Sequence, residues 1–367
     1  YNDNTEFIRY FAKRLIEDAS KEDARYDYNE IQIIAADTHS NSQEIANRML
    51  SDSELMDLID VVADHYTLYG NDALSQVNQE YGKEVWYDEA VAPQINADDR
   101  INVDPARGGV GGTGSMTDIA TRFINMYQYA GAGENPARMT RFSFQPAVAA
   151  FYEGSSYNPK QLLGAFDPWS GYYEADGGLQ AVGHFMEFAE VGWEYLPEAC
   201  YGDGNYTDGG VVVDTGTNNY LTLKDPETDD YSMIFANNTS QTRKYEVTVK
   251  NLDKADSTLN VWETRGPDEG EPFDANWMQN VDTITPSKTG TETYTFYLTV
   301  QPYSIVTVTS LLDKGVEYTS GQNDSGVERT VLELPYTDDF EYTEYALDEK
   351  GRTYLERRGG TPRYTTD

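Results

Sequence analysis

The first half of the chain alternates between two spacings of hydrophobic positions. Apolar residues recur every three or four positions around Phe7, Phe11 and Leu15, which is the spacing of an amphipathic helix. Short apolar runs between such segments predict strands. The predicted strands cover residues 31–37, 58–66, 84–89 and 141–145, and the predicted helices cover 4–18, 41–49, 71–80, 115–129 and 177–189. This alternation indicates a parallel sheet with crossover helices, either half of a (β/α)8 barrel or a small doubly wound sheet.

The pattern changes near residue 195. Helical spacing disappears there, and short runs rich in Thr, Val and Tyr alternate between apolar and polar positions, with turn residues between them. These runs lie at residues 220–223, 231–236, 244–250, 258–262, 292–300 and 304–310. They predict an antiparallel β-sandwich, so the fold class is α/β followed by all-β.

Three regions follow from this change. Residues 1–194 form the α/β region, residues 195–312 the sandwich, and residues 313–367 a polar linker with the start of a further domain. The last predicted helix of the α/β region runs into the sandwich without a segment rich in Gly, Ser or Pro. We therefore expect these two regions to pack rigidly against each other.

Composition excludes several classes of function. The 367 residues contain 27 Lys and Arg against 63 Asp and Glu, a formal net charge of −36. This charge repels nucleic acid and anionic membrane surfaces, and no apolar run reaches the length of a transmembrane helix. The single cysteine, Cys200, excludes an internal disulfide. The histidines His39, His65 and His184 form no close pair, so no metal site is predicted.

Polar residues stand at the carboxyl ends of several predicted strands, where a barrel builds its active site. Glu89 ends the third predicted strand and is the candidate nucleophile of a retaining glycosidase. Asp88 is the weaker candidate, because neighbouring residues of a strand face opposite sides. His65 and Tyr66 end the preceding strand, so their side chains are expected to reach Glu89. The competing interpretation is that Glu89 is one of 63 acidic residues on the surface.

Two further segments carry candidate chemistry. The loop at 167–173 contains Trp169, which suits stacking on a sugar ring or packing between domains. The long loop that begins near Arg265 is rich in Pro, Gly and Asp, and loops of that length are usually functional. A guanidinium donates paired hydrogen bonds to sugar hydroxyls. The alternative is that Arg265 forms an ion pair with a neighbouring acid such as Asp268.

Taken together, these segments resemble glycoside hydrolase family 59 in order and spacing over nearly the whole chain. Residues 33–37, 61–66 and 85–89 are similar to the family's fifth, sixth and seventh barrel strands, and the last of these ends in the nucleophile. Tyr157 and Trp169 lie in a segment that matches a family run in spacing as well as in residue type. Residues 335–340 resemble the opening of the family's lectin-like domain.

The resemblance implies a partial (β/α)8 barrel, strands five to eight, followed by the β-sandwich. It implies a retaining β-glycosidase without a cofactor, acting on terminal β-galactosides of glycan or glycolipid, with Glu89 as nucleophile. The family's acid/base Glu aligns immediately upstream of Tyr1. The N-terminal half of the barrel, covalent or associated, is therefore an expected partner.

The resemblance also implies substrate-binding roles. His65 and Tyr66 orient the site, and Tyr157 and Trp169 shape the sugar pocket. Phe144 stands on a strand that supplies a Trp in the family, and Arg265 is the candidate for the arginine that reaches the substrate from the sandwich. A secreted or cell-surface location in a bacterium is expected.

Two alternatives stay open. One is an enzyme of the related family 30, of glucosylceramidase or endo-β-1,6-galactanase type. The other is a carbohydrate-binding surface protein whose barrel has lost catalysis. An Asn-Glu pair directly before Tyr1 would favour an enzyme over the binding protein.

Overall fold

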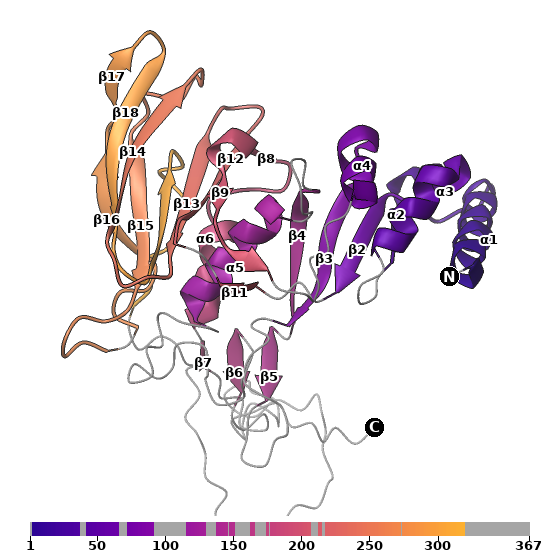
Figure 1. Ribbon diagram of the computed structural model, residues 1–367, viewed down its shortest axis with the longest axis horizontal. Coiled ribbons are helices and arrows are strands. Elements are labelled where there is room, and N and C mark those ends of the chain that lie inside the picture. The colour runs from indigo at the N-terminus through magenta and orange to yellow at the C-terminus, as the bar shows by residue number, and fades with distance from the viewer. Residues whose placement is uncertain are drawn as a thin grey trace, which may run out of the picture. The chain divides into compact units, whose positions relative to one another are not determined.

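Figure 1 shows the computed structural model of the chain. It describes residues 2–36, 42–65, 72–91, 115–129, 137–145, 147–150, 162–165, 174–175, 177–206, 212–214, 217–272 and 274–319. The chain divides into two compact units that interleave along the sequence. The first unit comprises residues 1–91, 122–145 and 201–219, and the second comprises 92–121, 146–200 and 220–367. The domain boundary near residue 195 stays a prediction.

None of the helices in the described ranges is both long and apolar enough to cross a membrane.

A four-stranded parallel sheet organises the first unit. Its strands, in spatial order, are β1 (Ile34–Ala35), β2 (Val61–His65), β3 (Glu84–Val91) and β4 (Met139–Gln145). All three neighbouring pairs are parallel. Around the sheet lie α1 (Asn2–Ala19), the 3-10 turn η1 (Tyr28–Glu30), α2 (Ser42–Ser51), α3 (Ser53–Leu58) and α4 (Asp72–Tyr81). The predicted alternation of strands and helices is confirmed.

The start of the second strand differs from the prediction. The sequence predicts a strand over residues 58–66, but α3 occupies the segment up to Leu58 and the strand begins at Val61. Asp52 caps α3, because its side chain accepts the backbone N–H of Leu55 at 3.2 Å. Leu55 and Met56 bury one face of the helix. A helix of this length is too short for its apolar spacing to be recognised, so the cap and the burial determine it.

The two faces of the parallel sheet have different surroundings. On the helix face, Val62 and Tyr87 belong to a buried cluster that includes residues of α2, α3 and α4. On the other side, Val61, Ala63 and Trp86 form a separate buried cluster, which defines the Trp86 face. Neighbouring residues of one strand thus alternate between the two faces, as strand geometry requires.

Helix α5 (Met116–Tyr129) begins with a cap, in which the Ser115 hydroxyl accepts the N–H of Asp118 at 3.2 Å. Farther along, Asn125 is fully buried in the first unit. It donates to Oδ1 of Asn219 at 2.8 Å and accepts the N–H of Gly204 at 3.1 Å. These bonds hold a segment that contains β9 (Tyr201–Gly202), β10 (Asn205–Tyr206) and β11 (Val212–Asp214).

Two sheets of mainly antiparallel strands organise the second unit. The larger has the order β16-β15-β19-β13-β12-β8 and the smaller the order β14-β18-β17. Their bounds are β8 (Glu194–Tyr195), β12 (Asn219–Lys224), β13 (Tyr231–Asn237), β14 (Arg243–Lys250), β15 (Leu259–Arg265), β16 (Gln279–Ile284), β17 (Ser287–Gly290), β18 (Thr293–Val300) and β19 (Ser304–Thr309). Phe235 and Val306 of the larger sheet share one buried cluster with Phe296 and Leu298 of the smaller. The two sheets therefore pack face to face.

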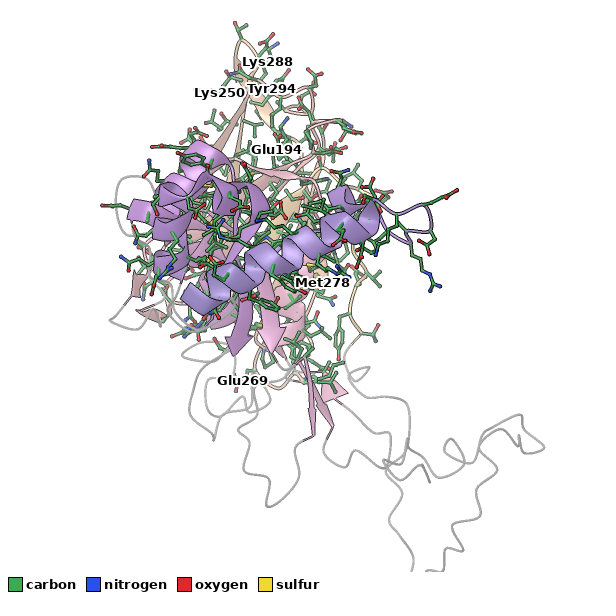
Figure 2. All side chains as sticks on the ribbon, turned by 90° about the vertical axis from the view of Figure 1, so that its right-hand side faces the viewer. Glu194, Lys250, Glu269, Met278, Lys288 and Tyr294 are labelled. Carbon is green, nitrogen blue, oxygen red and sulfur yellow. The ribbon has the colours of Figure 1, made fainter. Side chains whose placement is uncertain are left out.

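The six strands predicted beyond residue 219 are present, and β16 and β17 are additional. These two strands were not predicted because nearly all their positions are exposed or polar. On the smaller sheet, Lys288 of β17 lies over the ring of Tyr294 of β18, 5.8 Å from its centroid (Figure 2). The second unit also contains β5 (Val148–Ala150), β6 (Leu163–Ala165), β7 (Glu174–Ala175) and the 3-10 turn η3 (Pro197–Ala199).

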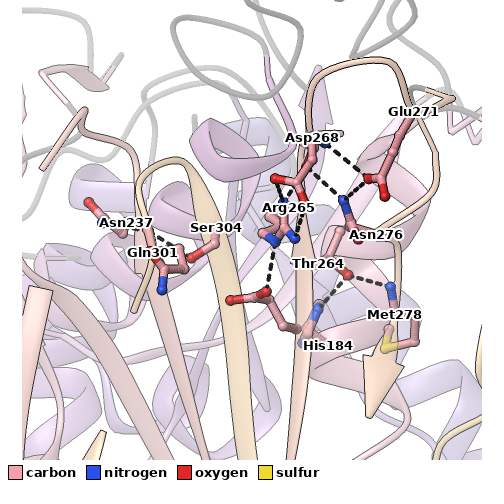
Figure 3. Close-up of polar contacts among 12 residues, drawn as sticks. His184, Asn237, Thr264, Arg265, Asp268, Glu271, Asn276, Met278, Gln301 and Ser304 are labelled. Atoms are coloured by element: carbon pink, nitrogen blue, oxygen red, sulfur yellow. Dashed lines mark hydrogen bonds and ion pairs between the residues drawn. The ribbon is translucent and has the colours of Figure 1, made fainter. Parts of the chain in front are cut away.

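Helix α6 (Gly177–Met186) packs on the larger sheet through a buried histidine (Figure 3). His184 places Nε2 2.8 Å from the Thr264 hydroxyl and Nδ1 2.8 Å from the Thr307 hydroxyl. The N–H of Met278 donates to the Thr264 oxygen at 2.8 Å. The Thr307 hydroxyl donates to the backbone carbonyl oxygen of His184 at 3.4 Å, so its oxygen accepts from Nδ1–H and Nε2 accepts from the Thr264 hydroxyl. Complete burial lowers the pKa of His184 to about 3.

Residues 313–319, here called the strap, pack on the same sheet. The sequence predicts the start of a polar linker at this point. Gly315 has φ of +88° and passes so close to Trp262 that an added Cβ would lie 2.5 Å from Cζ2 of the indole. The ring of Tyr318 lies 5.4 Å from that of Trp277. One close backbone approach and one aromatic contact are thus enough to hold a segment of polar composition.

Candidate active site at the carboxyl edge of the parallel sheet

The carboxyl ends of the four parallel strands meet at one edge of the first unit's sheet. His65 ends β2, Glu89 lies near the end of β3, and Phe144 lies near the end of β4. Three of the predicted site residues therefore occupy neighbouring strands at the edge where α/β enzymes bind their substrates. For these three residues the structure describes the strand positions alone. Tyr66, Tyr157 and Trp169 lie outside the described residues.

The register of β2 and β3 sets position 65 directly opposite position 89. Earlier partners along these strands share a face, since Ala63 pairs with Trp86 and both belong to the buried cluster of the Trp86 face. Asp64 then pairs with Tyr87, which belongs to the helix face. The next pair joins His65 and Glu89. By its register, position 89 falls in line with the Trp86 face.

A β-bulge in β3 produces this register. Between Tyr87 and Glu89 the strand has one residue more than β2. The same irregularity appears against β4, where Tyr87 pairs with Phe142 and Ala90 pairs with Phe144. The regular alternation expected from the sequence would put Asp88 on the Trp86 face and position 89 on the helix face. The bulge replaces that alternation, because its extra residue shifts every following position by one.

A cation lies two residue pairs before the bulge, on the Trp86 face. The guanidinium of Arg141 stands over the indole of Trp86, 4.4 Å from the ring centroid. The indole N–H donates to Glu84 at 2.6 Å. Arg141 was not among the candidates predicted from the sequence. The contact of Arg141 with Trp86 depends on the pairing of β3 with β4, which the sequence alone does not show.

Arg265 lies in the second unit, at the end of β15, and is engaged with acidic neighbours (Figure 3). Its two terminal nitrogens donate to the two carboxylate oxygens of Asp268 at 2.9 and 2.8 Å, and Nε donates to Glu263 at 3.0 Å. The bond from Arg265 lowers the pKa of Asp268. Desolvation raises the pKa of the Glu263 carboxyl, against the effect of Arg265. The ion pair considered from the sequence is present, and the substrate contact of Arg265 stays a prediction.

The loop after Arg265 is held by further bonds. Glu271 accepts the N–H of Asp268 at 3.1 Å and the side-chain amide of Asn276 at 3.0 Å. Asn276 also donates to the carbonyl oxygen of Gly266 at 3.1 Å. The loop rich in Pro, Gly and Asp is therefore folded on its own polar contacts. Among the described residues, no group of three or more His, Cys, Asp or Glu side chains is arranged to hold a metal ion.

Comparison with known families identifies the class of protein to which the parallel-sheet segment belongs. Residues 9–187 match the model of "Glycosyl hydrolase family 59". The match places residues 9–187 among the glycoside hydrolases. The resemblance drawn from the strand motifs is confirmed.

Several curated relatives share this segment. The galactocerebrosidase of Macaca mulatta is 28% identical over 183 residues, which cover 50% of this chain and 22% of the relative. That of Homo sapiens is 29% identical over 185 residues, 50% of this chain and 22% of the relative. That of Mus musculus is 26% identical over 263 residues, 69% of this chain and 33% of the relative. The chain thus matches between about a fifth and a third of the length of these relatives.

Among solved structures, a xylanase of glycoside hydrolase family 30 subfamily 8 from Clostridium acetobutylicum aligns with a TM-score of 0.47. The identity is 11%, and the alignment covers 77% of this chain and 56% of that chain. Because this TM-score is below 0.5, the fold is described from the strands and helices of the chain itself.

Proposed function

We propose that the chain carries the nucleophile of a retaining β-glycosidase and that this nucleophile is Glu89. The observation that supports the proposal is the register of β2 and β3, which sets Glu89 opposite His65 at the carboxyl edge of a parallel sheet. This edge lies within the family 59 segment. An ionised carboxylate there attacks the anomeric carbon and forms a covalent glycosyl-enzyme, which water then hydrolyses.

The reaction needs a second carboxyl group about 5–5.5 Å from the first. It protonates the leaving oxygen and then, as a base, activates the incoming water. We propose that this acid/base Glu comes from a preceding strand of a (β/α)8 barrel. Within the described residues, β1 and β4 are the edge strands of the sheet. Further strands from an N-terminal part of the protein, covalent or associated, would continue the sheet beyond β1 and close the barrel.

The proposed substrate is a terminal β-galactoside of glycan or glycolipid, as the name galactocerebrosidase of the relatives suggests. His65 and Tyr66 orient the nucleophile, and Phe144, Tyr157 and Trp169 line the sugar pocket. No cofactor is needed, because carboxyl groups supply both the nucleophile and the proton. A secreted or cell-surface location would bring the enzyme to such substrates.

Mechanism-based labelling tests the proposal. A 2-deoxy-2-fluoro-β-galactoside with a dinitrophenolate leaving group loses that group without protonation, while the fluorine slows hydrolysis of the glycosyl-enzyme. Peptide mapping of the full-length protein should place the sugar on Glu89, and the Glu89→Gln variant should take up none. A sugar on Asp88 or elsewhere would overturn the assignment. Retention on immobilised galactoside with no label at all would favour a carbohydrate-binding protein without catalysis.

A further inference from the structure

The bulge in β3 is the most unusual feature of the candidate site, since it disturbs the register with both neighbouring strands. Asp64 pairs with Tyr87 and His65 with Glu89, so β3 has two steps where β2 has one. Against β4, Tyr87 pairs with Phe142 and Ala90 with Phe144, so β3 has three steps where β4 has two. The extra residue lies between Tyr87 and Ala90 on both sides, immediately before or at the nucleophile.

Regular geometry would give a different site. In an unbulged strand, position 89 would follow Tyr87 on the helix face. There Tyr87 and Phe142 stack with ring centroids 5.4 Å apart, and the surrounding cluster is apolar. A carboxylate at that place would be desolvated and could not meet a sugar at the opposite face. The bulge is therefore what brings the position of Glu89 into line with Ala63 and Trp86.

We propose that Asp88 is a positioning residue. It is the extra residue of this bulge, and by stabilising the bulge it directs Glu89 toward the substrate. The inference rests on the proposed role of Glu89 as nucleophile. Asp88 is half-buried, unlike an acid that merely projects into solvent. Short side chains with an acceptor oxygen stabilise irregular backbone by bonding nearby N–H groups, which Asp and Asn do better than Ser, and Ala cannot do. The shape and acceptor of Asp88, rather than its charge, hold the bulge.

A graded series of substitutions tests this role in the full-length protein. The rate of labelling by the 2-fluoro galactoside should fall about 10–100-fold in Asp88→Ala, less in Asp88→Ser, and no more than about threefold in Asp88→Asn. The inactivator concentration for half-maximal rate should change by less than about twofold, because the sugar pocket is intact. Glu80→Ala, which removes an exposed acid on α4, is the matched control and should label at the normal rate.

The outcomes separate the inference from the proposed function. Normal labelling of Asp88→Ala, or labelling of Asp88→Asn as slow as that of Asp88→Ala, would overturn the positioning role, the second because charge would then matter instead of shape. If Asp88→Ala does not fold, the comparison of the Ser and Asn variants still decides. The proposed function fails on a different measurement. In that case, peptide mapping of the unsubstituted protein would find no sugar on Glu89.

Discussion

Polar residues have opposite surroundings in two regions of the molecule. One region is the contact of α6 with the larger β-sheet, and the other is the carboxyl edge of the parallel sheet. Beneath α6, His184 is fully enclosed and each ring nitrogen has a threonine hydroxyl as partner. At the sheet edge, β3 departs from regular pairing at the point where positions 65 and 89 are paired. A buried polar group with all its bonds made stabilises one arrangement, whereas an irregular strand re-aims a residue for use. The first region is expected to determine stability and the second activity.

The largest effect should come from removing the nucleophile. Glu89→Gln should lower kcat/KM on an aryl β-galactoside by roughly a thousandfold or more, equivalent to about 4 kcal/mol of transition-state stabilisation. The melting temperature should stay within a few degrees of the unsubstituted value, because Gln has nearly the same size and shape as Glu. Glu80→Gln on α4 serves as the control. A fall in melting temperature that parallels the loss of activity would show that Glu89 contributes to stability. The two regions would then not differ in the way described above.

The strap should show the reverse behaviour, a loss of stability. Gly315→Ala must accommodate both a φ of +88° and a Cβ within 2.5 Å of Trp262, so it should lower the free energy of unfolding by about 2–4 kcal/mol. Gly270 has the same φ of +88° but nothing within 4 Å of an added Cβ, so Gly270→Ala should cost only about 1 kcal/mol. Denaturant unfolding of the two variants measures the difference. Equal losses would mean that the strap does not press on Trp262.

Acidification should weaken the contact of α6. The folded state lowers the pKa of His184 from 6.5 to about 3, so only the unfolded state binds a proton between those values. Stability is therefore complete above about pH 6.5 and declines as the pH falls, by about 2 kcal/mol at pH 5. Carboxylates with lowered pKa values, such as that of Asp229, lose their contribution only at lower pH.

Denaturant unfolding at pH 7 and pH 5 checks this slope. His184→Gln should be less stable at pH 7 but should lose less on acidification, because no imidazole is left to titrate. The same pH dependence in both proteins would show that His184 is not the group responsible.

The smallest effect is expected at Arg265. If Arg265 reaches the sugar, Arg265→Ala should lower kcat/KM by at least about 10-fold, or 1.4 kcal/mol, with little change in melting temperature. Asp268→Ala removes the ion-pair partner but keeps the guanidinium, and should leave kcat/KM within a few-fold of the original value. Equal losses in both variants would indicate that Arg265 acts by holding the loop. Unchanged kinetics in Arg265→Ala would remove it from the site.

Much of the element order could be predicted from hydrophobic spacing. The four parallel strands, the helix α5 and the change to β-structure near residue 195 all followed from local patterns. The missed elements were those without such a pattern. Helix α3 depends on the cap formed by Asp52, and β16 and β17 have mostly exposed positions. Pairing with a neighbouring strand determines such segments, and pairing is not visible in spacing.

The amino-acid sequence by itself determined most of the strands and helices, and that His65 and Glu89 lie at or near strand ends. It also carried the motifs by which family 59 was recognised. Tertiary structure decided the face and the partners of each polar residue. Alternation is local, but register depends on strands distant in sequence, and the one extra residue in β3 brought position 89 into line with the Trp86 face. His184 likewise became a packing residue only when Thr264 and Thr307 met it from two strands.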